Sequence, residues 1–203
     1  MRWPQGRIVQ DDSKYCYITG SVAYRGNLPP PARVPAEAVD RKRLQDYSGA
    51  MTAIVLVHPE IPGNTGAVGR TCVALDLELI LIHPLGFTIT DTRLKRAGLD
   101  YWQHIRLSEY ASWDAFLAQR APRADQLFLF EEYAPRSFYE PDYPADAYLV
   151  FGRETKGLPP EIVEAHRERL VSLPMRSDKV RSLNLANTVA AAAYQAMRGS
   201  FLP

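Results

Sequence analysis

A regular alternation of short apolar runs and polar, helix-like stretches begins at Met51 and constrains the fold more than any other feature of the sequence. The apolar runs are continuous rather than alternating, which indicates strands buried on both faces. Strands are predicted at residues 53–58, 78–83, 105–107, 126–130, 147–151 and 171–173. Because helical patterns separate these runs, the sequence predicts an α/β fold with a mostly parallel sheet flanked by helices.

The predicted helices have recognisable start signals. Asn64 or Thr65 is expected to cap a helix that runs to about residue 74, Asp91 a short basic helix, and Ser112 the segment WDAFLAQR. A further helix is expected at 159–170, with proline in its first turn. The last helix is expected to begin at Ser182 and to contain four consecutive alanines at 190–193. That small surface predicts close approach by another helix, either of the same chain or of a second subunit.

The first 50 residues do not follow this pattern. They contain the proline cluster LPPPARVP at 28–35 and carry eight Lys and Arg against five Asp and Glu. Such a composition favours a tail or linker over a folded domain. The predicted organisation is therefore an N-terminal extension at 1–50 and one domain at 51–203. An over-extended translation start remains an alternative, because Met51 opens the strand pattern.

Composition excludes several classes of protein. The chain of 203 residues has a formal net charge of +1, so no global basic field indicates nucleic-acid binding. Its two cysteines give no disulfide framework, and no apolar run reaches the roughly 20 residues of a membrane helix. A soluble, cytoplasmic protein is expected. The scattered histidines suggest no metal site, and neither a phosphate-binding P-loop nor a Gly-x-Ser-x-Gly elbow is present.

Three loops follow predicted strand ends, where open parallel sheets bind ligands. They span residues 59–70, 151–159 and 174–184. In the second loop, Gly152 would let the backbone approach a ligand and Gly157 would permit a turn. The third leads into a helix N-terminus, which offers free N–H groups to a polar ligand. Ordinary readings stay open at this point: a surface arginine at Arg70, a plain strand–turn–helix joint, and an alanine-rich surface helix.

Four ordered motifs carry a resemblance to a known family. They are PEIPGNTGAVGR (59–70), HPLGFTITDTRLKRAGLDYW (83–102), FGRETKGLP (151–159) and LPMRSDKVRSLNLANTVAAAAYQA (173–196). Together they resemble the SPOUT superfamily of RNA methyltransferases, and most closely the enzymes that 2′-O-methylate the wobble cytidine or uridine of certain leucine tRNAs. The resemblance spans about residues 51–198. It implies S-adenosylmethionine as cofactor, tRNA as substrate and no metal.

The resemblance also implies a fold that periodicity cannot show. The C-terminal segment would thread through a loop to form a deep trefoil knot, against the usual rule that connections do not thread. The loops of the knot would form the cofactor site. A homodimer is expected, with the first and last helices at its interface, which would account for the small alanine surface.

Site residues are carried over by position from the family motifs. The implied catalytic residues are Asn64, Arg70, Glu154 and Asn184. The implied cofactor contacts are Phe130, Gly152, Leu173 and Ser182. The candidate RNA contacts are Arg93, Lys95, Arg96, Arg153, Lys179, Arg181 and Tyr194. Two positions depart from the family pattern: Arg153 replaces a common proline, and 130–132 (FEE) replaces small hydroxyl residues.

The predicted chemistry is methyl transfer to a ribose 2′-oxygen, which requires alignment and removal of one proton. Arginine stays protonated in proteins and is a poor general base, so Arg70 is expected to orient and stabilise charge. The family proposal that this arginine itself becomes the base stays open. Alternatives are methylation of another tRNA or rRNA ribose, or a non-catalytic knotted RNA-binding factor, which the complete set of motif residues disfavours.

Overall fold

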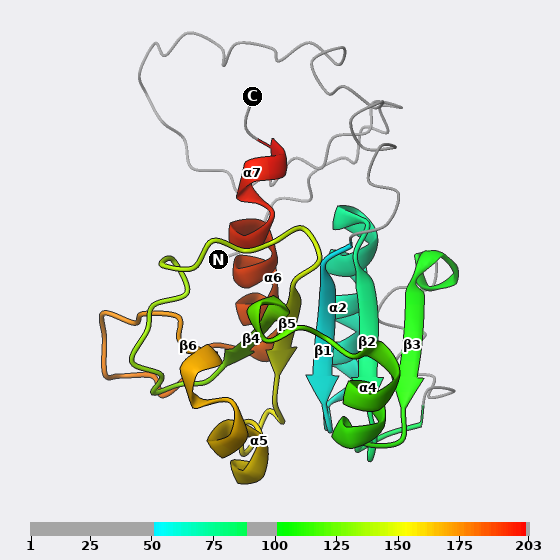
Figure 1. The fold of residues 1–203 in the computed structure, drawn as a ribbon, viewed down its shortest axis with the longest axis horizontal. Helices are drawn as coiled ribbons and strands as arrows, with labels where there is room; N and C mark the ends of the chain where they lie inside the picture. The colour runs from blue at the N-terminus through cyan, green and yellow to red at the C-terminus, as the bar shows by residue number, and fades with distance from the viewer. Residues whose placement is uncertain (1–50, 89–100, 202–203) are drawn as a thin grey trace, which may run out of the picture. The chain divides into compact units, whose positions relative to one another are not determined.

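The computed structural model describes residues 51–88 and 101–201. The predicted extension at 1–50 and the helix expected after Asp91 lie outside the described residues. A six-stranded sheet with the order β3-β2-β1-β5-β4-β6 forms the centre, and every neighbouring pair is parallel (Figure 1). The strands are β1 (Ala53–Val57), β2 (Glu78–Ile82), β3 (Arg106–Tyr110), β4 (Leu127–Phe130), β5 (Tyr148–Phe151) and β6 (Leu170–Val171). The predicted parallel α/β sheet is confirmed.

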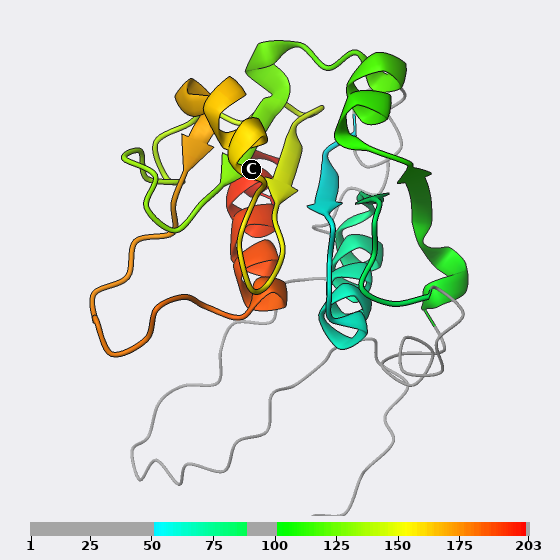
Figure 2. The same ribbon diagram turned by 90° about the horizontal axis from the view of Figure 1, so that it is seen from below.

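Helices cover both faces of the sheet, as the continuous apolar runs require (Figures 1 and 2). On one face, α2 (Pro62–Leu75) and α6 (Leu185–Ala196) pack on side chains such as Ile54 and Leu56. On the other, α4 (Trp113–Arg120) and α5 (Pro160–Ala165) pack on side chains such as Val55 and Val57. The remaining elements are η2 (Trp102–His104), η3 (Ala124–Gln126), η4 (Arg167–Arg169) and α7 (Arg198–Phe201). None of the helices in the described part is both long and apolar enough to cross a membrane.

The strand order places the ligand-binding edge of the sheet. The chain runs outward from β1 through β2 to β3, and β5 then inserts on the opposite side of β1. The carboxyl ends of β1 and β5 therefore lie side by side at the point where the direction of winding changes. Open parallel sheets bind ligands outside such points. The loops after β4, β5 and β6 reach the same edge.

Two predicted helix starts are wrong, and both errors have a local cause. Helix α2 begins at Pro62 rather than after Asn64 or Thr65, because the fixed φ of proline suits the first helical position. Helix α6 begins at Leu185 rather than at Ser182, and the Oδ1 of Asn184 accepts a capping hydrogen bond from the backbone N–H of Ala186 at 2.9 Å. The start after Ser112 is confirmed, since its hydroxyl accepts from the N–H of Ala115 at 3.1 Å.

The helix predicted at 159–170 is interrupted. Helix α5 ends at Ala165, and His166, with φ −127° and ψ 29°, leads into η4 and then β6. The alanine surface has a partner within the chain. Ala192 and Ala193 are fully buried, and α6 packs against α2 and the sheet. Two of the four alanines thus belong to the core of this chain, whereas Ala191 is exposed.

Candidate functional site

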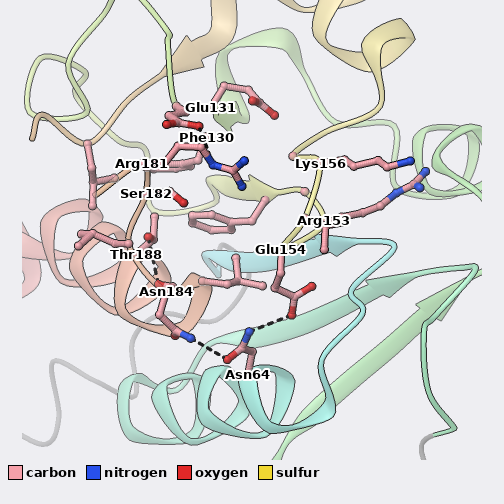
Figure 3. Close-up of a pocket in the computed structure, with 18 of the residues that line it drawn as sticks. Asn64, Phe130, Glu131, Arg153, Glu154, Lys156, Arg181, Ser182, Asn184 and Thr188 are labelled. Carbon is pink, nitrogen blue, oxygen red and sulfur yellow. Dashed lines mark hydrogen bonds and ion pairs between the residues drawn. The ribbon is translucent and has the colours of Figure 1, made fainter. Parts of the chain in front are cut away.

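A cavity of about 630 Å³ opens at the carboxyl ends of β4, β5 and β6 (Figure 3). Its lining combines apolar strand ends with charged and polar loop residues. The apolar part includes Phe130, Phe151, Val171 and Leu173. The charged part includes Glu131, Glu132, Arg153, Glu154, Lys156 and Arg181, and the polar part includes Asn64, Ser182, Asn184 and Thr188. An apolar floor with a few convergent polar groups is typical of small-molecule sites.

The apolar floor is built by two aligned strands. Phe130 and Phe151 are register partners of β4 and β5. Their rings stack with centroids 4.5 Å apart and an interplanar angle of 18°. Both side chains are largely buried, so the stack is fixed by the sheet rather than by a ligand. The floor is consequently preformed.

The loop after β5 closes on itself. Arg153 and Gly157 exchange two backbone hydrogen bonds, each 2.9 Å long. A Cβ on Gly152 would lie 2.0 Å from the carbonyl carbon of Gly157, so only glycine fits there. Gly157 has φ +68°, a left-handed conformation that favours glycine. The prediction of a turn at Gly157 is confirmed. Gly152, however, makes room for the backbone of its own loop.

The carboxylate of Glu154 joins this loop to the loop after β1. It accepts hydrogen bonds from the backbone N–H of Glu60 at 2.8 Å, from the N–H of Ile61 at 3.2 Å and from Nδ2 of Asn64 at 3.1 Å. Oδ1 of Asn64 in turn accepts from Nδ2 of Asn184 at 2.9 Å (Figure 3). This Glu154–Asn64–Asn184 bridge ties together the three loops singled out in the sequence. It fixes both amide orientations, since the nitrogen of each amide donates and its oxygen accepts.

A reciprocal contact strengthens the same junction. Oε2 of Glu60 accepts from the hydroxyl of Thr155 at 2.7 Å and from its backbone N–H at 3.3 Å. The loop after β1 and the loop after β5 therefore each contribute a carboxylate to the other. Charge-assisted hydrogen bonds of this kind are stronger than neutral ones.

The acidic pair after β4, which departs from the family pattern, has a structural partner. Oε1 of Glu131 accepts from the backbone N–H of Leu158 at 2.6 Å. Burial raises the pKa of this carboxyl. Glu132 lies near the basic segment, with Oε2 4.0 Å from Nε of Arg181. The two carboxylates thus link the β4 end to the loops at 157–158 and 181.

Arg153, the other departure, contacts a histidine. Its Nη2 lies 3.2 Å from Nδ1 of His58, which follows β1 with φ 54°. Burial, and then the charge of Arg153, lower the pKa of His58. The neutral imidazole can therefore accept a hydrogen bond from the guanidinium. This contact orients an arginine at the rim of the cavity.

The structure separates Arg70 from the cavity. Arg70 is exposed on α2 and is not among the residues that line the pocket. Its guanidinium carbon lies 4.5 Å from the centroid of the Tyr101 ring. Tyr101 donates a hydrogen bond from its hydroxyl to the carbonyl oxygen of Gly66 at 2.6 Å. The other implied catalytic residues, Asn64, Glu154 and Asn184, all line the cavity, as do the four implied cofactor contacts.

The candidate RNA contacts are divided. Arg153 and Arg181 line the cavity, whereas Lys179 and Tyr194 are exposed away from its lining. Tyr194 is 56% exposed, and its ring lies 6.0 Å from that of Phe201. Arg93, Lys95 and Arg96 lie outside the described residues. Within residues 51–88 and 101–201, no group of three His, Cys, Asp or Glu is placed to hold a metal ion.

Sequence reasoning missed several residues of the site. Thr188 lines the cavity one helical turn after Asn184, and its hydroxyl donates to the carbonyl oxygen of Asn184 at 3.2 Å. The helical i, i+4 spacing was a usable signal for it. Lys156 also lines the cavity and lies in the loop after β5, between Glu154 and Gly157. Outside the cavity, Tyr101 gave no local signal, because its two partners lie on another element.

Comparison with known proteins identifies the family of the chain. A family model described as the SpoU rRNA Methylase family matches residues 51–194. The chain belongs to the SpoU rRNA methylase family. The match begins at the strand pattern and ends in α6, so it contains every described element that contributes to the cavity.

Individual proteins that are similar to this chain include RNA methyltransferases. The tRNA (cytidine(34)-2'-O)-methyltransferase of Burkholderia cenocepacia is 44% identical over 149 residues, which cover 73% of this chain and 95% of the relative. A solved structure concerned with 2-OH methylation of C/U34 on tRNA is 44% identical, with a TM-score of 0.68. The match covers 73% of this chain and 95% of the chain in that structure. The SpoU methyltransferase AviRb from Streptomyces viridochromogenes, solved in complex with AdoMet, is 25% identical, with a TM-score of 0.63. This match covers 74% of this chain and 60% of AviRb.

Proposed function

We propose that this SpoU-family chain is an S-adenosylmethionine-dependent methyltransferase that modifies the 2′-oxygen of the nucleotide-34 ribose, cytidine or uridine, in leucine tRNA. The observation that carries the proposal is the Glu154–Asn64–Asn184 bridge, which gathers three distant loops around one cavity. Identity of 44% to a relative named for cytidine-34 2′-O-methylation supports the reaction and its target.

The cavity fits the proposed cofactor. Its volume of about 630 Å³ lies within the usual range for small-molecule sites, roughly 300–1,000 Å³. The apolar floor of Phe130 and Phe151 suits the apolar surface of an aromatic base, and the surrounding loops offer polar groups. Phe130, Gly152, Leu173 and Ser182 are the residues proposed to hold S-adenosylmethionine. When bound, the cofactor supplies an electrophilic methyl group on a sulfonium sulfur.

The segment after β6 is proposed to thread into the trefoil knot of the SPOUT fold. Support comes from its first residue. Ser172 donates its backbone N–H to the carbonyl oxygen of Arg136 at 2.9 Å and accepts from the N–H of Phe138 at 2.9 Å. The hydroxyl of Ser172 also donates to the carbonyl oxygen of Ala134 at 2.9 Å. The connection between β4 and β5 is thus held against the chain where it leaves β6.

The protein's own contribution to the chemistry is orientation and charge stabilisation. Arg70 has an exposed guanidinium that remains protonated and offers N–H donors to an RNA phosphate or ribose oxygen. We assign it the role of orienting the nucleotide, with the adjoining phosphate as the proton acceptor. A homodimer is part of the proposal, because Arg70 lies outside the lining of its own chain's cavity.

RNA binding is proposed to rely on local basic groups. Arg153 and Arg181 line the cavity together with Lys156. Lys179 lies in the same exposed segment as Arg181, two residues before it. The formal net charge is only +1, so attraction depends on these patches rather than on a global field. Contacts to phosphates weaken steeply as salt rises. Transfer to tRNA is therefore expected to fall with added salt more than cofactor binding does.

The experiment uses the full chain, labelled S-adenosylmethionine and total tRNA, followed by nucleoside mapping. The expected product is a 2′-O-methylated nucleotide 34 in leucine tRNA. Label at another tRNA ribose, or only in ribosomal RNA supplied in parallel, would reassign the target. No transfer to any RNA under conditions where the cofactor binds would favour a non-catalytic RNA-binding factor.

Arg70→Ala tests whether Arg70 acts in methyl transfer rather than in cofactor binding. Transfer should fall by at least about a hundredfold, as expected when a transition-state contact is lost, while calorimetry shows unchanged cofactor affinity. Arg167→Ala removes an exposed arginine of η4 and is the matched control. The rate of methyl transfer by this variant should stay within about twofold of the parent rate. Equal loss of cofactor binding and transfer in Arg70→Ala would indicate a folding role instead.

A further inference from the structure

The pair formed by Tyr101 and Arg70 is the most informative feature outside the cavity. Tyr101 is 8% exposed, whereas Arg70 is exposed. The guanidinium carbon lies 4.5 Å from the ring centroid, within the range of a cation–π contact. The hydroxyl of the same tyrosine donates to the carbonyl oxygen of Gly66 at 2.6 Å. Gly66 and Arg70 are four residues apart on α2, so one tyrosine contacts both from the same side of the helix.

This contact holds the arginine without occupying its hydrogen-bond donors. A guanidinium stacked on a ring uses its face, and the N–H groups at its edge stay available. Arg106, Arg120 and Arg167 instead form ion pairs with carboxylates. Among the ion pairs of the described residues, none involves Arg70. Arg70 is thus held by an uncharged partner and keeps its full charge and its donors for an anion.

The tyrosine itself is fixed by its neighbours. Tyr101 precedes η2, and the N–H of His104 donates to its carbonyl oxygen at 2.9 Å. The segment then packs closely on α2 at Gly69. A Cβ there would lie 2.6 Å from Cδ1 of Ile105 and 3.2 Å from Cζ3 of Trp102. The missing side chain at Gly69 lets this segment lie against the helix one residue before Arg70.

We propose that Tyr101 is a positioning residue for the methyl-transfer reaction, presenting the N–H edge of Arg70 to the phosphodiester beside the methylated ribose. The inference rests on the proposed function of Arg70. Its physical basis is preorganisation: a long, exposed side chain that is already held in place loses less freedom on binding. An aromatic platform does this without neutralising the charge that the phosphate requires.

The kinetic test compares two substitutions in the full chain. Tyr101→Phe keeps the ring and loses the hydroxyl anchor, whereas Tyr101→Leu removes the platform. Tyr101→Leu should lower kcat for tRNA methylation about tenfold, with the cofactor Kd within about twofold of the parent. Tyr101→Phe should retain most of kcat. Tyr139→Leu, which changes an exposed tyrosine away from α2, is the control and should leave kcat unchanged.

A double substitution tests whether Tyr101 acts through Arg70. In an Arg70→Ala background, Tyr101→Leu should add less than about a twofold further loss, because no cation then remains over the ring. An additional tenfold loss in that background would show that Tyr101 acts independently of Arg70 and would overturn the inference. A kcat within twofold of the parent for folded Tyr101→Leu would overturn it as well.

A measurement on the parent protein remains decisive if Tyr101→Leu fails to fold. NMR signals of the Arg70 side chain, assigned by comparison with Arg70→Lys, should show upfield ring-current shifts in the native chain. Random-coil positions for these signals would contradict the stacked geometry. Absence of tRNA methylation by the parent would defeat the proposed function, while an active parent insensitive to Tyr101→Leu would defeat only this inference.

Discussion

Asn184 donates a side-chain hydrogen bond to Oδ1 of Asn64 at 2.9 Å across 120 residues of sequence. The same Asn184 caps α6 by accepting from the N–H of Ala186. Asn64 passes the connection on to Glu154. One residue therefore both starts the last long helix and links it to the loop after β1, so the stability of the helix and the shape of the cavity are coupled.

Substitutions at Asn184 can separate these two roles. Asn184→Ala should lower the free energy of unfolding by about 1 kcal/mol through loss of the cap. Asn184→Ser keeps a capping oxygen but lacks the amide that reaches Asn64. It should retain most of the stability while weakening cofactor binding. Chemical denaturation and calorimetry measure the two effects. Parallel losses of stability and affinity in Asn184→Ser would contradict the separation.

Glu154→Gln should be strongly destabilising for a conservative change. The carboxylate accepts from three donors, and an amide nitrogen in place of one oxygen would face a backbone N–H. Loss of hydrogen bonds to a charged group costs about 1.5–3 kcal/mol. Glu168→Gln, at an exposed position of η4, is the matched control and should change the unfolding free energy by less than about 0.5 kcal/mol. Similar urea midpoints for the two variants would refute the bridge as a stabilising element.

Three glycine-to-alanine changes should rank in a defined order. Gly152→Ala is the most damaging, because its Cβ would lie 2.0 Å from backbone. Gly157→Ala should cost about 1–2 kcal/mol for the left-handed conformation. Gly63→Ala has nothing within 4 Å of the new Cβ and should stabilise α2 by about 0.5–1 kcal/mol. Melting temperatures test the order, and a stabilised Gly152→Ala would show that the loop can rearrange.

The stability of the protein should decline as the pH falls below about 6.5, the ordinary pKa of histidine. Burial lowers the pKa of His58 and of His166, so the unfolded chain binds more protons than the folded chain in the window just below that value. The contribution is fully present above the window and is lost as the pH falls through it. Glu131, whose pKa is raised, acts in the opposite direction as the pH falls.

His58→Asn isolates the histidine contribution, because asparagine tolerates the positive φ of this position. The difference in unfolding free energy between the parent and this variant, measured at pH 8, 6.5 and 5.5, should change in favour of the variant as the pH falls. Glu131 contributes equally to both proteins and cancels. A difference that is independent of pH would show that His58 does not titrate differently on folding.

Local signals in the sequence predicted much of the fold. Continuous apolar runs identified the parallel strands, and Ser112 identified the start of α4 because its capping partner is only three residues away. The start of α6 at Asn184 was missed, since Ser182 is an equally good capping residue by type. Nothing local distinguishes the two. The choice follows from the contact between Asn184 and Asn64.

The site was predictable as a set of loops but not as a set of contacts. Family resemblance placed Asn64, Glu154 and Asn184 in one site, and they line one cavity. The partners of Glu131 and Tyr101 lie 27 and 35 residues away on other elements, and neither follows from spacing. Gly152 lines the cavity as the resemblance implied, but its close approach to the backbone of Gly157 was not foreseen, because a turn that closes on itself cannot be read from two glycines alone.

The pairing of β1 with β5 has a consequence for synthesis on the ribosome. Strand β1 acquires its second neighbour only after about 95 further residues have been made, as the pairing of Ala53 with Tyr148 shows. Helix α2 is covered by α6 only after a still longer stretch of the chain has been synthesised. Contacts of such long range slow folding and leave apolar surface uncovered in the meantime. Strand β1 and helix α2 therefore depend on the later elements β5 and α6 to cover their apolar side chains, and protection by a chaperone during that interval would raise the yield of native protein.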